Sequence, residues 1–214
     1  MRLALVLLAL CAALPAHAEI DRTTPGVPLD LPPPELDDLR LDSDEGVSYA
    51  AFERHVRSGY PAVDTIYLQT LYRHYAELCS IEGVSLIVAL AQMIHETGYL
   101  RFSGSVGAVQ YNYAGLGAVA EGVAGLRFPN MRTGVAAHVQ HIKAYADTMP
   151  LSTPLADPRF EYVRRGSAPT VRSLTGRWAT DPLYGAKLMA HIERLRRFEA
   201  NAAVPDGRAG GMRR

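Results

Sequence analysis

The stretch LIVALAQMIHETGYLRF, residues 86–102, decides how the rest of the sequence is interpreted. Residues 86–94 are apolar except for Gln92, and an apolar run of this kind is typical of a helix buried on nearly all sides. Ser85 stands before the run and Gly98 follows it, and both are common helix-boundary residues. The sequence therefore predicts a central core helix that ends on His95, Glu96 and Thr97.

Amphipathic patterns on both sides of this stretch predict further helices, whose ranges are 47–59, 62–83, 133–147, 168–178 and 181–201. Thr133 is the expected N-cap of its helix, and Asp181 with Pro182 opens the last one. In the second helix the apolar face comprises Ile66, Leu68, Leu71, Tyr75 and Leu78. Residues 104–130 contain many glycines and no helical period, so they predict a small β-hairpin or loop lobe. The expected fold class is mainly α.

The first 18 residues have the pattern of a signal peptide. Arg2 precedes an apolar stretch over residues 3–14, and Ala16-His17-Ala18 is a small-x-small cleavage pattern. Twelve apolar residues are short for a stable membrane span. We therefore expect export, to the periplasm or the extracellular space. Cleavage would remove Cys11 and leave Cys79, which lies in an apolar helical pattern and is expected to be a buried structural thiol.

Charge is unevenly distributed along the chain. Residues 19–45 hold nine acidic and two basic side chains and many prolines, which predicts a disordered acidic linker. Residues 202–214 predict a flexible basic tail, so the folded domain is expected over residues 46–201. After residue 45 the chain has 19 basic and 13 acidic residues, a balance that suits an anionic partner such as cell wall. The basic residues form no stripe interleaved with aromatic residues, so nucleic acid is not an expected partner. The oligomeric state is left open.

A histidine and a carboxylate at the end of a core helix have three interpretations: a zinc site, a solvated helix end, and a catalytic acid. A zincin helix needs a second histidine four residues after the first, and Tyr99 stands there. His138 and His141 are three residues apart, a spacing typical of an amphipathic helix surface. No metal site is therefore expected.

The choice between a solvated helix end and a catalytic acid depends on the helix face that leads to Glu96. Helical steps back from Glu96 reach Gln92, Ala89 and Ser85, a small and polar stripe on an otherwise apolar helix. Such a stripe could line a cleft beside a carboxylic acid that protonates a leaving oxygen. His95 steps back through an apolar face, so it is interpreted as a packing residue. The residues alone leave both interpretations of Glu96 open.

Four blocks in order carry a family resemblance: ALAQMIHETGYLRFSGSV, YNYAGLGA, FPNMRTGVAAHVQHIKAYA and GRWATDPLYGAKL. Together they resemble a glucosaminidase domain of glycoside hydrolase family 73, over about Tyr67 to Leu195. The resemblance implies a lysozyme-like, mainly helical fold. It also implies hydrolysis of the β-1,4 bond after N-acetylglucosamine in the glycan strands of peptidoglycan, with no cofactor.

The resemblance also assigns roles to particular residues. It implies that Glu96 is the general acid and that the segment containing Asn112 and Tyr113 lines the sugar cleft. The tyrosine of the ATDPxY block falls on Tyr184, and Trp178 precedes it. These residue types suit a glycan, because aromatic rings stack on sugars and an amide can bind an acetamido group. Gln92, Asn112, Tyr113, Trp178 and Tyr184 are thus the predicted substrate-binding residues.

Members of the family often carry a second carboxylate in a hairpin after the asparagine block. Glu121 is the only carboxylate between Glu96 and Asp147, so it is the predicted second catalytic residue. Three alternatives remain open. The acetamido group of the substrate could assist instead, the protein could be a lytic transglycosylase that needs one acid, or it could be a non-catalytic cell-wall-binding protein on the same fold.

Overall fold

The computed structural model describes residues 30–31, 38–102, 107–118 and 124–202. Five α-helices account for about half of these residues: α1 (Tyr49–Gly59), α2 (Thr65–Glu82), α3 (Leu86–Thr97), α4 (Met131–Ala146) and α5 (Tyr184–Ala202). Three short 3-10 turns lie between them: η1 (Ala108–Gln110), η2 (Phe160–Tyr162) and η3 (Arg172–Leu174). β pairing within the described ranges is limited to two isolated bridges. The mainly α prediction is confirmed.

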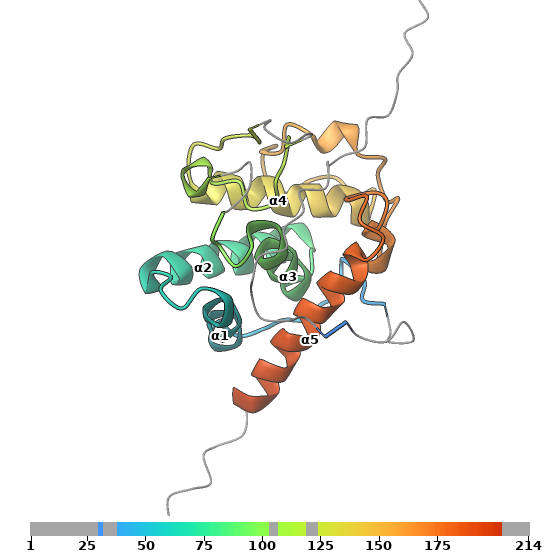
Figure 1. Cartoon of the computed structure of the whole chain (residues 1–214). Coiled ribbons are helices and arrows are strands. Elements are labelled where there is room, and N and C mark those ends of the chain that lie inside the picture. The colour runs from blue at the N-terminus through green and yellow to red at the C-terminus, as the bar shows by residue number, and fades with distance from the viewer. Residues whose placement is uncertain (1–29, 32–37, 103–106, 119–123, 203–214) are drawn as a thin grey trace, which may run out of the picture.

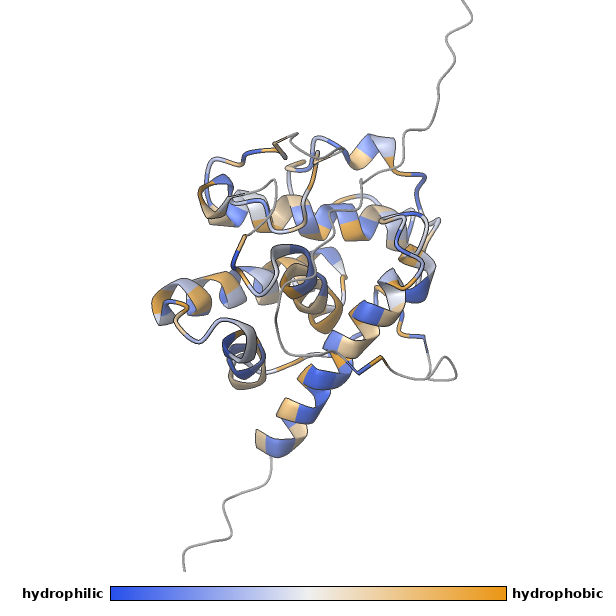
Figure 2. Cartoon of the chain, viewed as in Figure 1, coloured by the Kyte–Doolittle hydropathy of each residue, from blue (hydrophilic) through white to orange (hydrophobic). Residues whose placement is uncertain are grey.

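Helix α3 lies at the centre of the molecule, with α2 and α4 on one side and α5 crossing it on another (Figure 1). Nine of its twelve residues are buried, as its apolar sequence predicted. The covering helices are amphipathic: α5 alternates hydrophilic and hydrophobic residues along the ribbon in Figure 2. The apolar faces of these helices bury α3, and the end of α3 at Thr97 is where the core meets the loop segments.

The helices predicted at α1, α2 and α3 are present, with ends within three residues of the predicted ones, but two expectations about the second half of the chain are wrong. Helix α4 begins at Met131, and its N-cap is Asn130, whose side chain accepts hydrogen bonds from the backbone N–H (2.9 Å) and the hydroxyl (3.1 Å) of Thr133. Thr133 is therefore a donor to the cap and not the cap itself. The helix predicted over residues 168–178 is reduced to turns that include η3.

Two predictions about surface and core also need correction. Ile66, expected on the apolar face of α2, is 74% exposed, because it lies in the first turn, ahead of the buried residues of that helix. His138 and His141, interpreted as surface residues of α4, are 0% and 2% exposed. α4 is buried on more sides than its sequence suggested, because α2 packs along it and the 147–178 segment contributes Asp157 and Trp178 beside His141. Cys79 is buried as predicted, and burial raises the pKa of its thiol.

Residues 38–45, which the sequence assigned to the disordered linker, pack against the domain. The N–H of Leu41 donates to the carbonyl of Pro169 (2.9 Å), and the carbonyl of Leu41 accepts from Ser85 (2.7 Å). The Leu41 side chain is fully buried, and Glu45 pairs with Arg196 on α5. This segment, the strap, therefore joins the start of α3 to the segment before η3. The rest of the predicted linker and most of the predicted tail lie outside the described residues.

The loop lobe is held close to the N-terminal turn of α4. At Gly134, a Cβ atom would lie 1.8 Å from the carbonyl oxygen of Tyr111, so only glycine allows this approach. The described parts of the lobe form η1 and irregular backbone, which agrees with the loop alternative. Among the described residues, no helix has the length and apolarity needed to cross a bilayer.

Candidate active site

The end of α3 presents Glu96 at the edge of the core. Gly98 caps the helix with a left-handed φ of 56°, and the next two residues, Tyr99 and Leu100, keep positive φ values of 61° and 64°. The hydroxyl of Thr97 accepts a hydrogen bond from the Leu100 N–H (2.9 Å), which closes the turn. The chain thus leaves the helix within two residues of Glu96, and its carboxyl remains half-buried.

One oxygen of the Glu96 carboxyl accepts two hydrogen bonds. The indole N–H of Trp178 donates to Oε1 over 3.1 Å, and the hydroxyl of Tyr184 donates to the same atom over 2.6 Å. An oxygen that accepts two such bonds acts as the carbonyl oxygen of a protonated carboxyl group. When Glu96 holds a proton, that proton therefore belongs on Oε2. When Glu96 is ionised, the two donors stabilise its charge.

Trp178 reaches Glu96 from inside the core. The side chain is 1% exposed, and its ring packs edge-on against His141, with centroids 4.9 Å apart. His141 is itself held by Asp157, whose Oδ2 lies 2.6 Å from Nδ1. Tyr145 also contacts the indole ring. Trp178 is thus a hydrogen-bond donor to Glu96, and its ring is held by the core. Its predicted contact with a sugar stays a prediction.

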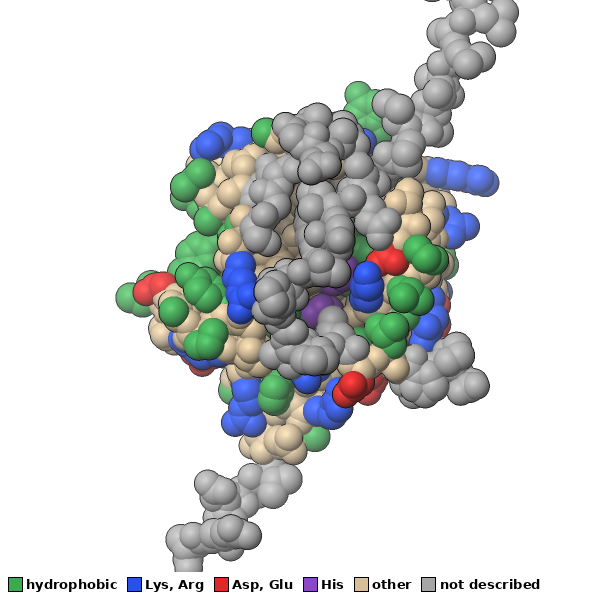
Figure 3. Space-filling model, viewed as in Figure 1, with side chains coloured by type: hydrophobic (Ala, Val, Ile, Leu, Met, Phe, Trp, Pro, Cys, Tyr) green, Lys and Arg blue, Asp and Glu red, His purple; other side chains and the backbone are tan. Residues whose placement is uncertain are grey.

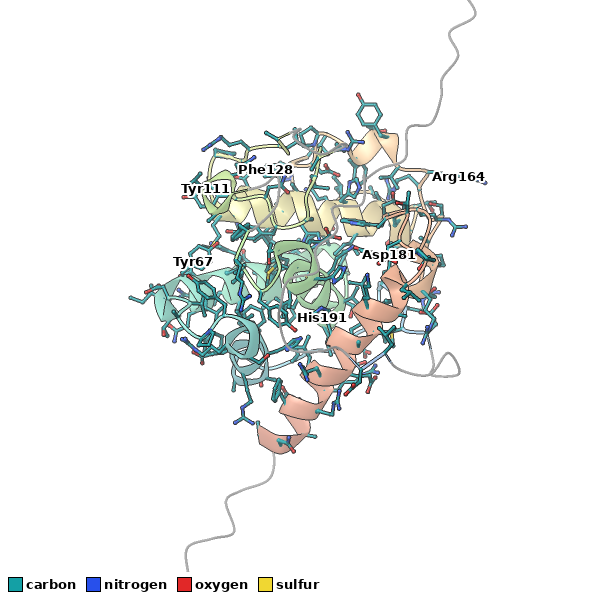
Figure 4. All side chains as sticks on the ribbon, in the orientation of Figure 1. Tyr67, Tyr111, Phe128, Arg164, Asp181 and His191 are labelled. Atoms are coloured by element: carbon teal, nitrogen blue, oxygen red, sulfur yellow. The ribbon has the colours of Figure 1, made fainter. Side chains whose placement is uncertain are left out.

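Tyr184, the first residue of α5, connects Glu96 to the core. It is 2% exposed, and its oxygen accepts a hydrogen bond from the Gln92 amide (2.7 Å) while its proton goes to Glu96. Gln92 was expected to line a cleft, but it is fully buried because Tyr184 covers it. Asp181 lies three residues before α5 (Figure 4), where its carboxyl accepts a hydrogen bond from the Leu183 N–H.

Asn112 and Tyr113 shape the loop lobe. The Asn112 amide donates to the carbonyls of Leu116 (2.9 Å) and Leu126 (3.0 Å), and its oxygen accepts from the Leu116 N–H. Tyr113 is fully buried, and its hydroxyl lies 3.1 Å from that of Tyr67 on α2. Both side chains therefore hold the lobe in place, and their predicted contacts with substrate remain to be tested. Glu121, the predicted second carboxylate, lies outside the described residues.

Three histidines, His95, His138 and His191, lie near Glu96 and its hydrogen-bond partners. His95 is half-buried, with its ring against those of Tyr184 (5.5 Å) and His191 (5.6 Å), and Figure 4 shows His191 on the side of α5 that faces α3. Burial lowers the pKa of His191 far below its usual value, and it lowers the pKa of His138 to about 3. Both rings are therefore neutral near neutral pH. Within the described ranges, no three His, Cys, Asp or Glu side chains gather in a metal-binding cluster.

One face of the molecule carries histidine side chains near its centre, with Lys and Arg side chains on both sides of them and Asp or Glu side chains close by (Figure 3). The contacts that sequence reasoning missed are buried ones, above all the hydrogen bonds of His138. The sequence did not reveal that His138 is buried, because its three-residue spacing to His141 is typical of an exposed helix surface.

A half-buried carboxyl, held by two donors at the edge of a helical core, has the features of the acid of a glycoside hydrolase. Residues 72–197, more than half of the chain, match the glucosaminidase family, described as mannosyl-glycoprotein endo-beta-N-acetylglucosaminidase. The chain belongs to this family of glycan hydrolases. Glu96 and its two hydrogen-bond donors, Trp178 and Tyr184, lie within the matched range.

A relative in Borreliella burgdorferi, an uncharacterized protein, is 44% identical over 128 residues, which are 60% of this chain. The match covers 63% of that protein's own length. No solved structure matches the chain.

Proposed function

We propose that this protein is a peptidoglycan hydrolase, an endo-β-N-acetylglucosaminidase that cleaves the β-1,4 bond after N-acetylglucosamine with Glu96 as general acid. The observation that carries the proposal is the pair of hydrogen bonds from Trp178 and Tyr184 to one oxygen of Glu96. They leave Oε2 as the oxygen that carries the proton. Membership of the glucosaminidase family supports the same reaction class.

The reaction breaks the bond between the sugar C1 and the glycosidic oxygen. Oε2 of Glu96 gives its proton to that oxygen, so the leaving sugar departs as an alcohol and Glu96 becomes a carboxylate. Trp178 and Tyr184 stabilise the negative charge that develops on the carboxyl group. One water adds its hydroxyl to C1, and its remaining proton passes to a base. Glu121 and the ionised Glu96 are the candidate bases, the latter if the acetamido group of the substrate assists.

The choice of peptidoglycan rests on three features. The sequence blocks are similar to those of wall-degrading glucosaminidases, and the chain after residue 45 has an excess of basic residues. Residues 1–18 have the pattern of a signal peptide, so the proposed location is the periplasm or the extracellular space. Asn112 and Tyr113 would act in substrate binding by holding the loop lobe beside the cleft, and Gln92, Trp178 and Tyr184 by holding Glu96.

The test is the substitution Glu96→Gln in the purified protein, assayed on cell-wall sacculi. Removal of a general acid costs about 10²- to 10⁴-fold in rate. Glu77→Gln is the matched control, because Glu77 pairs with Arg132 on the exposed surface of α2 and α4. The control should stay near the wild-type rate. Activity of Glu96→Gln within a few-fold of wild type would exclude Glu96 as the acid.

Mass spectrometry of the released fragments decides between the alternatives. Reducing N-acetylglucosamine ends are expected from the proposed hydrolase. Anhydro-muramic ends would instead assign the protein to the lytic transglycosylases, which need one acid. Tight binding to sacculi with no released fragment would indicate a non-catalytic cell-wall-binding protein.

A further inference from the structure

A chain of buried hydrogen bonds runs from α2 through α4 to Glu96. The hydroxyl of Tyr75 lies 2.7 Å from Nδ1 of His138, and Nε2 of His138 lies 3.2 Å from Oε1 of Gln92. The Gln92 amide nitrogen donates to Tyr184 (2.7 Å), and Tyr184 donates to Glu96 (2.6 Å). The helices α2, α3, α4 and α5 thus contribute to one series of hydrogen bonds. We call this series the relay, and its members are Tyr75, His138, Gln92, Tyr184 and Glu96.

The side chains of the relay are closed off from solvent until Glu96. Tyr75, His138 and Gln92 are 0% exposed, and Tyr184 is 2% exposed. A buried polar group that loses its hydrogen-bond partner cannot form a hydrogen bond with water instead. The orientation of each side chain in the relay therefore depends on its neighbour.

The direction of each hydrogen bond follows from the chemistry of the groups. The Gln92 amide nitrogen faces Tyr184, so its oxygen faces His138 and needs a donor there. Burial lowers the pKa of His138 to about 3, and a neutral imidazole has one donor nitrogen and one acceptor nitrogen. Nε2 of His138 therefore carries the proton, and Nδ1 accepts from Tyr75. Every donor in the relay points toward Glu96.

This direction matters because the Tyr184 hydroxyl has a single proton. If the Gln92 amide turned over, its oxygen would face Tyr184, and the Tyr184 proton would be drawn to Gln92 and away from Glu96. The N–H at Nε2 of His138 prevents that rotation, since it needs the Gln92 oxygen where it is. His138 thus controls a hydrogen bond to Glu96 without touching it.

We infer that His138 is a positioning residue of this enzyme, which fixes the Gln92 amide and so directs the Tyr184 proton to Glu96. This inference rests on the proposed function for its kinetic consequence, because the Tyr184–Glu96 bond strengthens as Glu96 gives up its proton. Its effect should therefore fall on kcat and not on KM.

Two substitutions of equal polarity separate this role from general packing. The amide nitrogen of glutamine reaches about as far from Cβ as Nε2 of histidine, whereas that of asparagine reaches only as far as Nδ1. His138→Asn should therefore lower kcat about tenfold with KM within about twofold of wild type. His138→Gln should retain most of the wild-type kcat. Equal losses in both variants would overturn the inference.

A double-mutant cycle with Tyr184→Phe tests the route of the effect. If His138 acts through the Tyr184 hydroxyl, His138→Asn should cause no further loss of kcat once that hydroxyl is absent. If the kcat losses of the two single variants multiply in the double variant, His138 acts by another route. Glu82→Gln is the stability control, because the Glu82 carboxylate is 2% exposed and accepts bonds from the Ser152 and Thr153 backbone. It should lower thermal stability and leave kcat unchanged.

A spectroscopic measurement tests the relay apart from activity. In wild-type protein labelled with ¹⁵N-histidine, NMR should find His138 neutral near neutral pH, with its proton on Nε2. A proton on Nδ1, or a doubly protonated ring, would overturn the inference even if the enzyme is active. If sacculi are not cleaved but the Nε2 proton is found, the proposed function fails and the direction of the relay stands.

Discussion

Replacing Tyr184 with phenylalanine removes one oxygen at the point where the relay reaches Glu96. The ring of Tyr184 packs against His95, so the substitution should keep the contacts of the ring. The lost hydroxyl donates to Glu96 over 2.6 Å and accepts from Gln92 over 2.7 Å. The change should therefore affect catalysis through the bond to Glu96 and stability through the bond to Gln92.

The expected magnitudes follow from these two bonds. A hydrogen bond to a charged group is worth about 1.5–3 kcal/mol, which corresponds to about a 10- to 150-fold loss of kcat if it is fully expressed in the transition state. The Gln92 N–H is left buried without its acceptor, at a cost of about 1–3 kcal/mol in the free energy of unfolding. For a domain of this size each kcal/mol lowers Tm by about 2–4 °C.

The assay is steady-state hydrolysis of soluble glycan strands, with kcat and KM determined separately, together with thermal unfolding. Tyr162→Phe is the control, since Tyr162 is 79% exposed on η2. A Tyr184→Phe enzyme with unchanged kcat would refute the argument that its hydroxyl stabilises the charge on Glu96. A large rise in KM alone would show that Tyr184 binds substrate and does not assist the acid.

Three further predictions concern stability. Leu41→Ala should lower the free energy of unfolding by about 2–5 kcal/mol, because the strap buries Leu41 completely, and denaturant unfolding checks this. Lowering the pH from about 6.5 toward 3 should destabilise the fold, because the unfolded chain binds protons at histidines that the fold keeps neutral, and a flat Tm over this range would contradict it. These histidines, each with a lowered pKa, are His55, His138 and His191. Leu100→Gly should be more stable than Leu100→Ala by about 1 kcal/mol in the free energy of unfolding, because Leu100 has a positive φ. At Leu90, within α3, the alanine variant should instead be more stable than the glycine variant. Thermal unfolding of the four variants checks both orders.

The helices were predictable because their signals are local. Periodic apolar residues and the glycines at 83 and 98 defined α2 and α3 without any knowledge of their neighbours. The N-cap of α4 was misplaced because Asn130 and Thr133 are both common capping residues, and only the backbone conformation shows which of them lies outside the helix.

The strap was missed because its partners are far away in the sequence. Leu41 pairs with Pro169 and Ser85, and an acidic, proline-rich segment gives no local sign of such pairing. The same limit applies to the site. The place of Glu96 at the end of a core helix left its role open, and only the family resemblance selected it as the acid. Gln92 was expected to line a cleft, whereas the structure shows it buried and bonded to Tyr184 of α5. The role proposed for His138 depends on its burial, and burial is a property of the packed helices together.

The left-handed turn after Glu96 explains how a core helix can end next to the proposed catalytic acid. Non-glycine residues with positive φ cost about 1–2 kcal/mol each, and both Tyr99 and Leu100 have this conformation. Tertiary contacts offset the cost: Tyr99 is 8% exposed with its ring against His55 and His191, and Leu100 is 5% exposed. A further helical turn would extend α3 beyond Glu96 and bury the carboxyl alongside it. The strained turn therefore keeps Glu96 half-buried, close enough to the core for Trp178 and Tyr184 to hold it and close enough to the surface for the reaction proposed for it.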